Sequence, residues 1–123
     1  MFAPIYKTLN TSAVQAIIGN PPRIYSSDMA PQGVAAPYIT WFVVHGQPYD
    51  HLSGPPGADS DTIQIDCWAG PMDKSELDCV KLAKAVRDAL DAAGQANQII
   101  INTRESDTKL FRIGLQVEFI HNR

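Results

Sequence analysis

The sequence is poor in the residues that build metal centres and disulfide frameworks, with 2 cysteines and 3 histidines among 123 residues. A tetrahedral zinc site needs about four protein ligands, and His45, His51 and His121 show no paired ligand spacing. In a cytoplasm that keeps thiols reduced, a disulfide between Cys67 and Cys79 is also unfavourable. We therefore expect no metal, no cofactor and no disulfide.

Long apolar runs and clusters of positive charge are lacking as well. No segment approaches the roughly 20 apolar residues of a membrane-spanning helix, and the opening MFAPIYKTLN lacks the basic start and apolar stretch of a signal peptide. The formal charge is −3, and the 10 basic residues are scattered instead of forming a stripe for phosphate contacts. We expect a protein of the cytoplasm that does not enter membranes and does not bind nucleic acid by sequence.

What the sequence does contain is a series of helix and strand patterns that fit one domain over residues 1–123. Ser12 and Gln15 have capping-box spacing in a broken N-terminal helix, which Pro21 and Pro22 end. Strands are predicted over 38–45, 62–69, 98–103 and 110–121, and an amphipathic helix over 74–93. This order, α-β-β-α-β-β, predicts an α+β fold in which a mainly antiparallel four-stranded sheet carries the long helix and the N-terminal helical segment on one face.

Three local features refine this prediction. The run 38–45 is dense in aromatic and β-branched residues, which is typical of a strand covered on both faces. The segment 46–61 contains SGPPG and several aspartates, and it predicts a long flexible loop. Asp73 and Glu76 have capping-box spacing, so the Asp73 carboxylate is predicted to cap the long helix.

Both cysteines lie within residues 63–80, close to Asp66, which is where a catalytic thiol would be sought first. Adjacent residues on a strand point to opposite faces, so Asp66 cannot readily act as the base for Cys67. Cys67 is in phase with the buried face of its strand, and Cys79 with the apolar stripe of the following helix. We interpret both as small core residues that meet across the helix–sheet interface.

The second face of the strand 62–69 carries side chains that the core does not explain. Trp68 lies there, and because one face is already committed to the helix, a large aromatic on the other indicates further cover from the chain or from a partner subunit. The polar face of the last strand supplies more positions, for which plain solvation is the alternative. The candidate subunit-interface residues are Trp68, Asp66, Arg112, Gln116 and Glu118, with His51 and Asp59 from the predicted loop.

Short phrases occur in a characteristic order along nearly the whole chain. MFAPIYKTL is followed by VQAIIGNPPRIY, APQGVAAPYITW and IQIDCWA, and the amphipathic helix is followed by FRIGLQVEF. The most characteristic pieces are RIY at 23–25, APQG at 30–33, PYITW at 37–41 and IQIDCWA at 63–69. In their order and spacing they resemble the tail-completion family of long-tailed bacteriophages, which includes tail terminator proteins similar to minor tail protein U and head-tail joining proteins.

The resemblance implies a non-enzymatic structural protein of the virion. It implies a small α+β protomer that is assembled in the host cytoplasm into a ring, often a hexamer, at the head-proximal end of the tail tube. Such a ring ends tube polymerisation and receives the filled head, and its partners are further copies of the chain, the tail tube protein and a head-tail connector or neck protein. DNA would pass through its lumen. The alternatives are a head-closure or connector protein on the portal side and, less favoured, a small hydrolase that uses Cys67 or a loop histidine.

Two physical features agree with a ring. A head-to-tail interface that closes needs two different surfaces on each protomer, and a sheet with apolar residues on both faces supplies them. The predicted loop would become ordered against a neighbouring subunit, as segments that fold on binding do.

Overall fold

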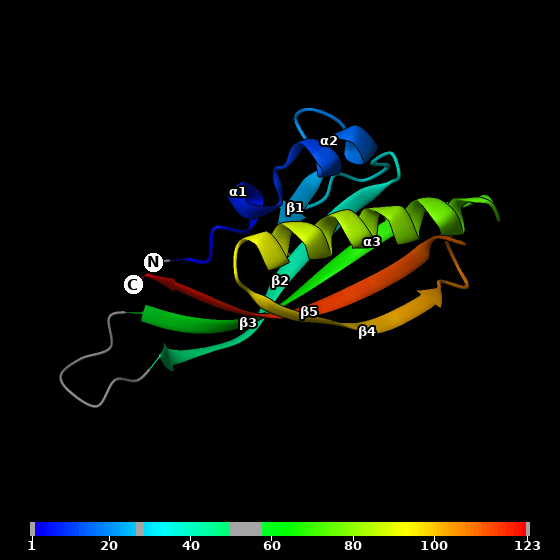
Figure 1. Cartoon of the computed structure of the whole chain (residues 1–123). Helices are drawn as coiled ribbons and strands as arrows, with labels where there is room; N and C mark the ends of the chain where they lie inside the picture. Colours follow the sequence, from blue (N-terminus) through cyan, green and yellow to red (C-terminus); the bar gives the residue numbers. More distant parts are fainter. Residues whose placement is uncertain (1, 27–28, 50–57, 123) are drawn as a thin grey trace.

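The computed structural model describes residues 2–26, 29–49 and 58–122, and it shows a sheet with helices on one face (Figure 1). The helices are α1 (Ile5–Leu9), α2 (Ser12–Ile18) and α3 (Ser75–Ala92). The strands are β1 (Ile24–Ser26), β2 (Tyr38–Tyr49), β3 (Ala58–Ala69), β4 (Ala96–Arg104) and β5 (Phe111–Asn122). Their spatial order is β1-β2-β3-β5-β4. No helix of the described residues covers the other face, which is called the open face below.

The core lies between the helices and the middle of the sheet. On β3, alternate residues face α3, and Ile63, Ile65 and Cys67 are fully buried there. Residues three and four apart on α3, such as Cys79 and Leu82, pack on this face because they form one stripe of the helix. α1 and α2 pack against α3. The predicted α+β class, with its helices on one face, is confirmed.

The number of strands was predicted wrongly, because the sheet has five strands and not four. The additional strand, β1, runs parallel to β2, with Ile24 opposite Ile39, so the sheet is mixed. The other strand pairs are antiparallel, as predicted. β1 holds only 3 residues, which is too few for an alternating pattern to be recognised.

The hairpin of β2 and β3 extends into the segment predicted as a loop. Residues 46–49 and 58–61 are paired strand, so the predicted flexible loop over 46–61 is wrong for them, while 50–57 lie outside the described residues. Glycine usually weakens a strand, but Gly46 faces Asp61, whose carboxylate oxygen occupies the space that a Cβ would take. Gly46, which we interpreted as part of a loop, is therefore explained by the close approach of the Asp61 side chain from the paired strand.

The far part of β2 is exposed, although a strand covered on both faces was predicted over 38–45. Phe42 is 36% exposed, and Val43 and Val44 are each 49% exposed. β1 pairs with β2 only along residues 39–41, so from Phe42 onward no described strand lies beside the outer edge of β2. The apolar run is real, but this chain alone does not bury it.

Both predicted capping boxes form differently. The N-cap of α2 is Thr11, whose hydroxyl oxygen accepts from the Val14 N–H at 3.3 Å, one residue earlier than predicted. The N-cap of α3 is Lys74, which makes no side-chain cap. The Asp73 carboxylate accepts instead from Nη1 of Arg104 at 2.9 Å, because a charge-assisted bond to a guanidinium is stronger than a bond to a neutral N–H.

Candidate functional site

Strand register brings the predicted interface residues of β3 and β5 together on the open face. Trp68 lies opposite Arg112, and Gln64 lies opposite Gln116. β2 contributes Tyr38, which is the register partner of Trp68. Since residues opposite each other share a face, these side chains form one continuous surface.

An aromatic pair forms the centre of this surface. The rings of Tyr38 and Trp68 are stacked, with centroids 6.1 Å apart and an interplanar angle of 15°. The indole Nε1 of Trp68 donates to the Thr40 hydroxyl oxygen at 3.0 Å. Partial burial raises the pKa of the Tyr38 hydroxyl above its usual value. The indole is therefore fixed by contacts with both of its β2 neighbours.

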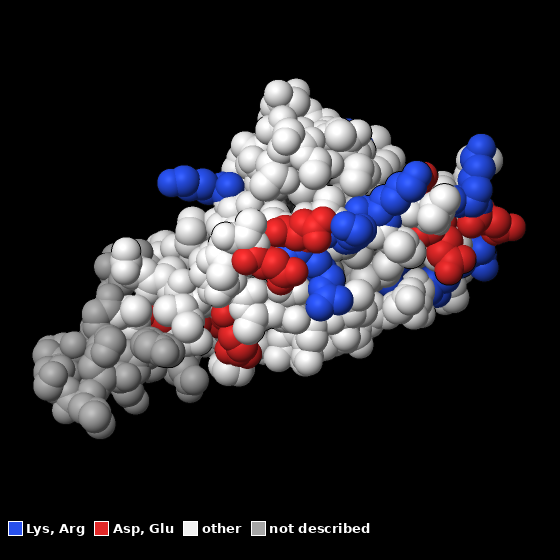
Figure 2. Space-filling model, viewed as in Figure 1, with Lys and Arg blue, Asp and Glu red and all other residues white. Residues whose placement is uncertain are grey.

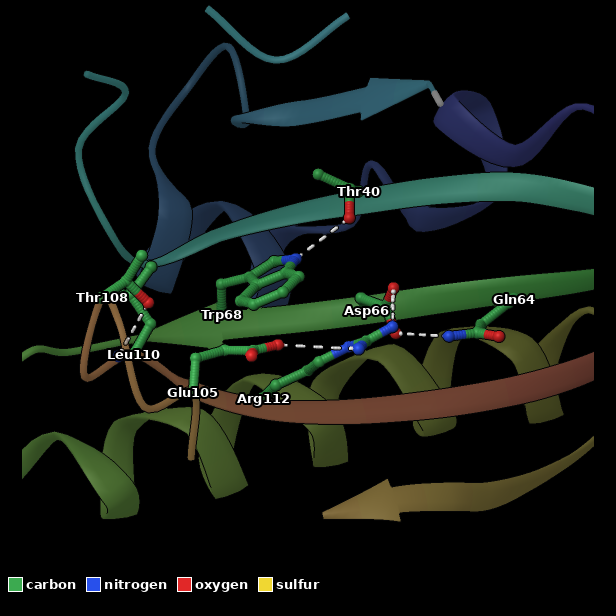
Figure 3. A network of polar contacts seen from close by, with 8 residues as sticks. All are labelled: Thr40, Gln64, Asp66, Trp68, Glu105, Thr108, Leu110 and Arg112. Atoms are coloured by element: carbon green, nitrogen blue, oxygen red, sulfur yellow. Dashed lines mark hydrogen bonds and ion pairs between the residues drawn. The ribbon is translucent and has the colours of Figure 1, made fainter. Parts of the chain in front are cut away.

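A network of charges adjoins the aromatic pair (Figure 3). Nη2 of Arg112 donates to Oδ2 of Asp66 at 3.0 Å, and the Gln64 amide donates to Oδ1 at 3.0 Å. Nη1 of Arg112 lies 3.6 Å from the Glu105 carboxylate, and its guanidinium lies 5.2 Å from the centroid of the Trp68 ring. Asp66 is buried and both of its carboxylate oxygens accept hydrogen bonds. Nε of Arg112 is also buried, but it has no hydrogen-bond partner among the described residues.

Gly114 makes room for this network. It lies opposite Asp66 in the β3–β5 register, and a Cβ at this position would be 2.7 Å from Oδ1 of Asp66. The same Cβ would be 3.3 Å from the Ile101 side chain on β4. A glycine at position 114 therefore leaves the space that the Asp66 carboxylate occupies.

Towards the far end of β5 the open face is polar. The Thr62 hydroxyl donates to the Glu118 carboxylate, with distances of 2.9 and 3.1 Å to its two oxygens.

Two shallow hollows flank the central strands. One, of about 740 Å³, lies beside β2 and is lined by Ala30, Tyr38, Thr40, Phe42, Val43, Asp66 and Trp68. The other, of about 270 Å³, lies beside β4 and is lined by Ala96, Asn97, Gln98, Gln116 and Glu118.

The structure separates the predicted interface residues into three groups. Those on the open face are Trp68, Asp66, Arg112, Gln116 and Glu118. Asp59 lies on the face that β3 turns towards the helices, opposite His121 in the register, and His51 lies outside the described residues. Of the first group, Asp66 is buried by its own chain, so it can shape the surface but offers little area of its own.

Sequence patterns missed the β2 and turn contributions to this surface. Tyr38 and Thr40 alternate on one face of β2, and this signal was hidden because the whole run was interpreted as buried. Glu105 lies in the connection between β4 and β5, and nothing in the sequence pairs it with Arg112. A second buried contact that was not foreseen joins Nε2 of His121 to Oδ2 of Asp61 at 2.7 Å.

The cysteines are buried core residues, as predicted. The Cys79 thiol donates to the Cys67 carbonyl oxygen at 3.3 Å, across the helix–sheet interface, and both thiols are free. Burial raises the pKa of Cys67 well above its usual value, and burial raises the pKa of Cys79 to about 11. Thiols of this kind are poor nucleophiles at neutral pH.

Other kinds of site find little support in the described part of the chain. Residues 2–26, 29–49 and 58–122 contain no group of three or more His, Cys, Asp or Glu side chains placed to hold a metal ion. None of the helices described is long and apolar enough to cross a membrane. Figure 2 shows charged side chains mainly along α3 and around the β4–β5 turn, with both signs mixed, so this view of the molecule presents no field of one sign.

The described residues thus form a two-layer α+β domain whose organised polar and aromatic groups lie on an open sheet face and not in a deep pocket. The model of the family described as tail completion protein gp17 matches residues 3–122. The chain belongs to this family, as its sequence phrases indicated, and is therefore a structural protein of the phage tail.

Comparison with solved structures supports the fold independently. A chain of the structure titled "Virion of native gene transfer agent (GTA) particle" is similar to this one with a TM-score of 0.61 and 16% identity. The likeness covers 95% of this chain and 92% of that chain. No curated protein matches the sequence.

Proposed function

We propose that this chain is a tail terminator or tail completion protein that forms a ring, of six copies in our hypothesis, at the head-proximal end of the phage tail tube. The ring ends tube polymerisation and provides the surface on which the filled head docks. The observation that carries the proposal is the family match over residues 3–122, joined to a sheet with an open face of preordered aromatic and charged side chains.

The open face has the properties of a protein contact surface. Tryptophan, tyrosine and arginine are enriched at the energetically important centres of interfaces, and Trp68, Tyr38 and Arg112 lie side by side here. Their mutual contacts hold the side chains in place, so less conformational entropy is lost when a partner binds. We assign the contact with a neighbouring subunit to this face, with the exposed Glu118 and the partly exposed Trp68, Arg112 and Gln116 as its members.

The small negative charge of the chain suits a ring whose lumen passes DNA. A surface without a basic stripe does not hold the phosphate backbone, so DNA moves through without being gripped. The virion, after assembly in the host cytoplasm, is the place of action in this proposal.

Purified protein, alone and mixed with the tail tube protein of the same phage, tests the ring and its function together. We expect a discrete ring by light scattering and tubes whose growth stops when the ring is added. A strict monomer that leaves tube growth unchanged would contradict the proposal.

The variants Trp68→Ala and Trp41→Ala test the open face specifically. Both remove an indole, but Trp41 packs against the helix-covered core, whereas Trp68 lies on the open face. We expect similar losses of thermal stability and a loss of ring assembly only in Trp68→Ala. Equal assembly in the two variants would remove the open face from the interface.

A head-closure or connector role on the portal side is the second candidate. The solved structure that shares the fold is a whole virion particle, and its title names no position within that particle. Co-purification with a neck or portal protein in preference to the tube protein would favour this role. The hydrolase alternative has less support, because the Cys67 thiol is buried and its pKa is raised.

A further inference from the structure

The sheet has an unpaired edge on each side. β4 is the last strand on one side, and no described strand pairs with its outer edge. On the other side, β1 covers β2 only from Ile39 to Trp41. From Phe42 onward, the outer edge of β2 has no strand neighbour among the described residues, and Pro48, which lacks an N–H, limits this free edge to residues 42–47.

Each of these edges carries one β-bulge, at Val44 and at Ile100, and β4 ends at Arg104, but their remaining length lacks charged residues and proline. Proteins protect exposed edges with charged side chains and proline, yet residues 42–47 (FVVHGQ) and 96–103 (ANQIIINT) contain no Lys, Arg, Asp, Glu or Pro. Both edges instead expose β-branched residues. On β2 these are Val43 and Val44, each 49% exposed. On β4 they are Ile99 and Ile100, which are 46% and 40% exposed.

Elsewhere in the sheet, a side chain satisfies the main chain of a strand where its outer side has no strand neighbour, at Ile120 of β5. β5 extends beyond the start of β4, and there the Gln95 side chain takes the place of a strand. Its amide donates to the Ile120 carbonyl at 3.2 Å, and its carbonyl oxygen accepts from the Ile120 N–H at 3.0 Å. No side chain of the described residues makes such a bond to the outer main chain of 42–47 or 98–103.

Strand direction makes the two edges complementary in a ring. Along the sheet β2, β3, β5 and β4 alternate in direction, so β2 and β4 run in opposite directions. When one copy is placed beside the next in the same orientation, β4 of the first therefore lies antiparallel to β2 of the second. The pairing uses a different surface on each copy and so can close into a ring.

We propose that neighbouring copies of this chain join by antiparallel main-chain pairing of β4 with the free edge of β2, residues 42–47. This inference rests on the proposed ring. The two hollows of the open face border these edges, so the junction brings the hollow that contains Phe42 next to β4 of the neighbour. Part of the open face, at the hollow that Phe42 and Trp68 line, thus takes part in the contact with the neighbour.

Two single substitutions block one edge each, because a charged side chain at an exposed edge opposes strand addition. Val44→Lys blocks β2 and Ile100→Lys blocks β4. We expect each variant alone to be a monomer by light scattering, with the circular dichroism and thermal unfolding of a folded chain. Val80→Lys is the matched control, because Val80 is also 46% exposed but lies on α3 and not on a strand; this variant should form rings.

Mixing the two blocked variants gives the sharpest result. Val44→Lys keeps a free β4 and Ile100→Lys keeps a free β2, so an equimolar mixture should form a dimer that cannot grow. Amide hydrogen exchange should then slow in residues 42–47 of one partner and 98–103 of the other. If Val44→Lys alone formed a dimer, β4 would pair with β4 across a two-fold axis, and the proposal would be wrong.

The outcomes separate this inference from the proposed function. Rings formed by both edge variants would overturn the edge pairing and leave the ring intact. A wild-type chain that stays monomeric with and without tube protein would overturn the ring, and the edge pairing with it. A folded mixture of the two variants that stays monomeric, while wild type forms rings, would also overturn the edge pairing.

Discussion

Replacing Arg112 with methionine should destabilise the protein far more than breaking an exposed ion pair. The Asp66 side chain is 4% exposed and that of Arg112 is 24% exposed, with 3.0 Å between Oδ2 and Nη2. Two unit charges about 4 Å apart attract by about 4 kcal/mol at an effective dielectric constant of about 20. Removing one partner of a fully buried pair costs about 3 to 5 kcal/mol. Because Arg112 is partly solvated and Gln64 still donates to Asp66, we expect a loss of about 2 to 3 kcal/mol.

Urea unfolding followed by circular dichroism measures this loss. The Ile100→Lys background keeps the protein monomeric in our proposal, so ring formation does not add to the apparent stability. Lys84→Met is the matched control, since Lys84 makes an equally short bond of 2.9 Å to Asp88 with both side chains largely exposed; about 0.5 kcal/mol is expected there. Combining Arg112→Met with Asp66→Asn should recover part of the loss, because the unpaired carboxylate is then gone. If Arg112→Met costs no more than Lys84→Met, the network does not stabilise the open face.

Three further outcomes follow from the buried groups. Gly114→Ala should lower stability by about 1 to 3 kcal/mol, seen as a lower melting temperature, because its Cβ meets the Asp66 carboxylate. Cys67 and Cys79 should resist a maleimide at pH 8 until urea is added; rapid labelling of the folded chain would revive the hydrolase alternative. Since the pKa of Cys79 is raised to about 11 in the folded chain, its contribution to stability is complete below about pH 9 and is lost as the pH rises towards 11. The urea midpoint of Cys79→Ala should therefore fall less over this range than that of wild type.

The sequence predicted those parts of the fold that depend on local periodicity. Cys67 and Cys79 were assigned to the core from the phases of one strand and one helix, and both are buried. The open-face position of Trp68 followed from the same alternation. The residue pattern of a strand does not show, however, whether other elements pack on its two faces. Val43 and Val44 were therefore wrongly predicted to be buried.

Contacts that depend on register were beyond the sequence. Arg112 and Asp66 are brought together by the alignment of β3 with β5, and the sequence shows only that each lies on a polar face. The cap predicted at Asp73 failed for a related reason, because its partner Arg104 lies at the end of a strand far along the chain. β1 escaped notice because parallel pairing of so short a strand depends on β2 and not on its own pattern.

Each of the two strands that have a free edge contains one residue without a partner in the register, Val44 in β2 opposite β3 and Ile100 in β4 opposite β5. An extra residue bends and twists its strand. Two bent edges do not meet in one plane, and in the proposed ring the angles at the junctions would add up to a full turn. In the proposed ring, the number of copies would then depend on local strand curvature. If the proposed ring forms by edge pairing, we expect deletion of Val44 or Ile100 to change how many copies close it.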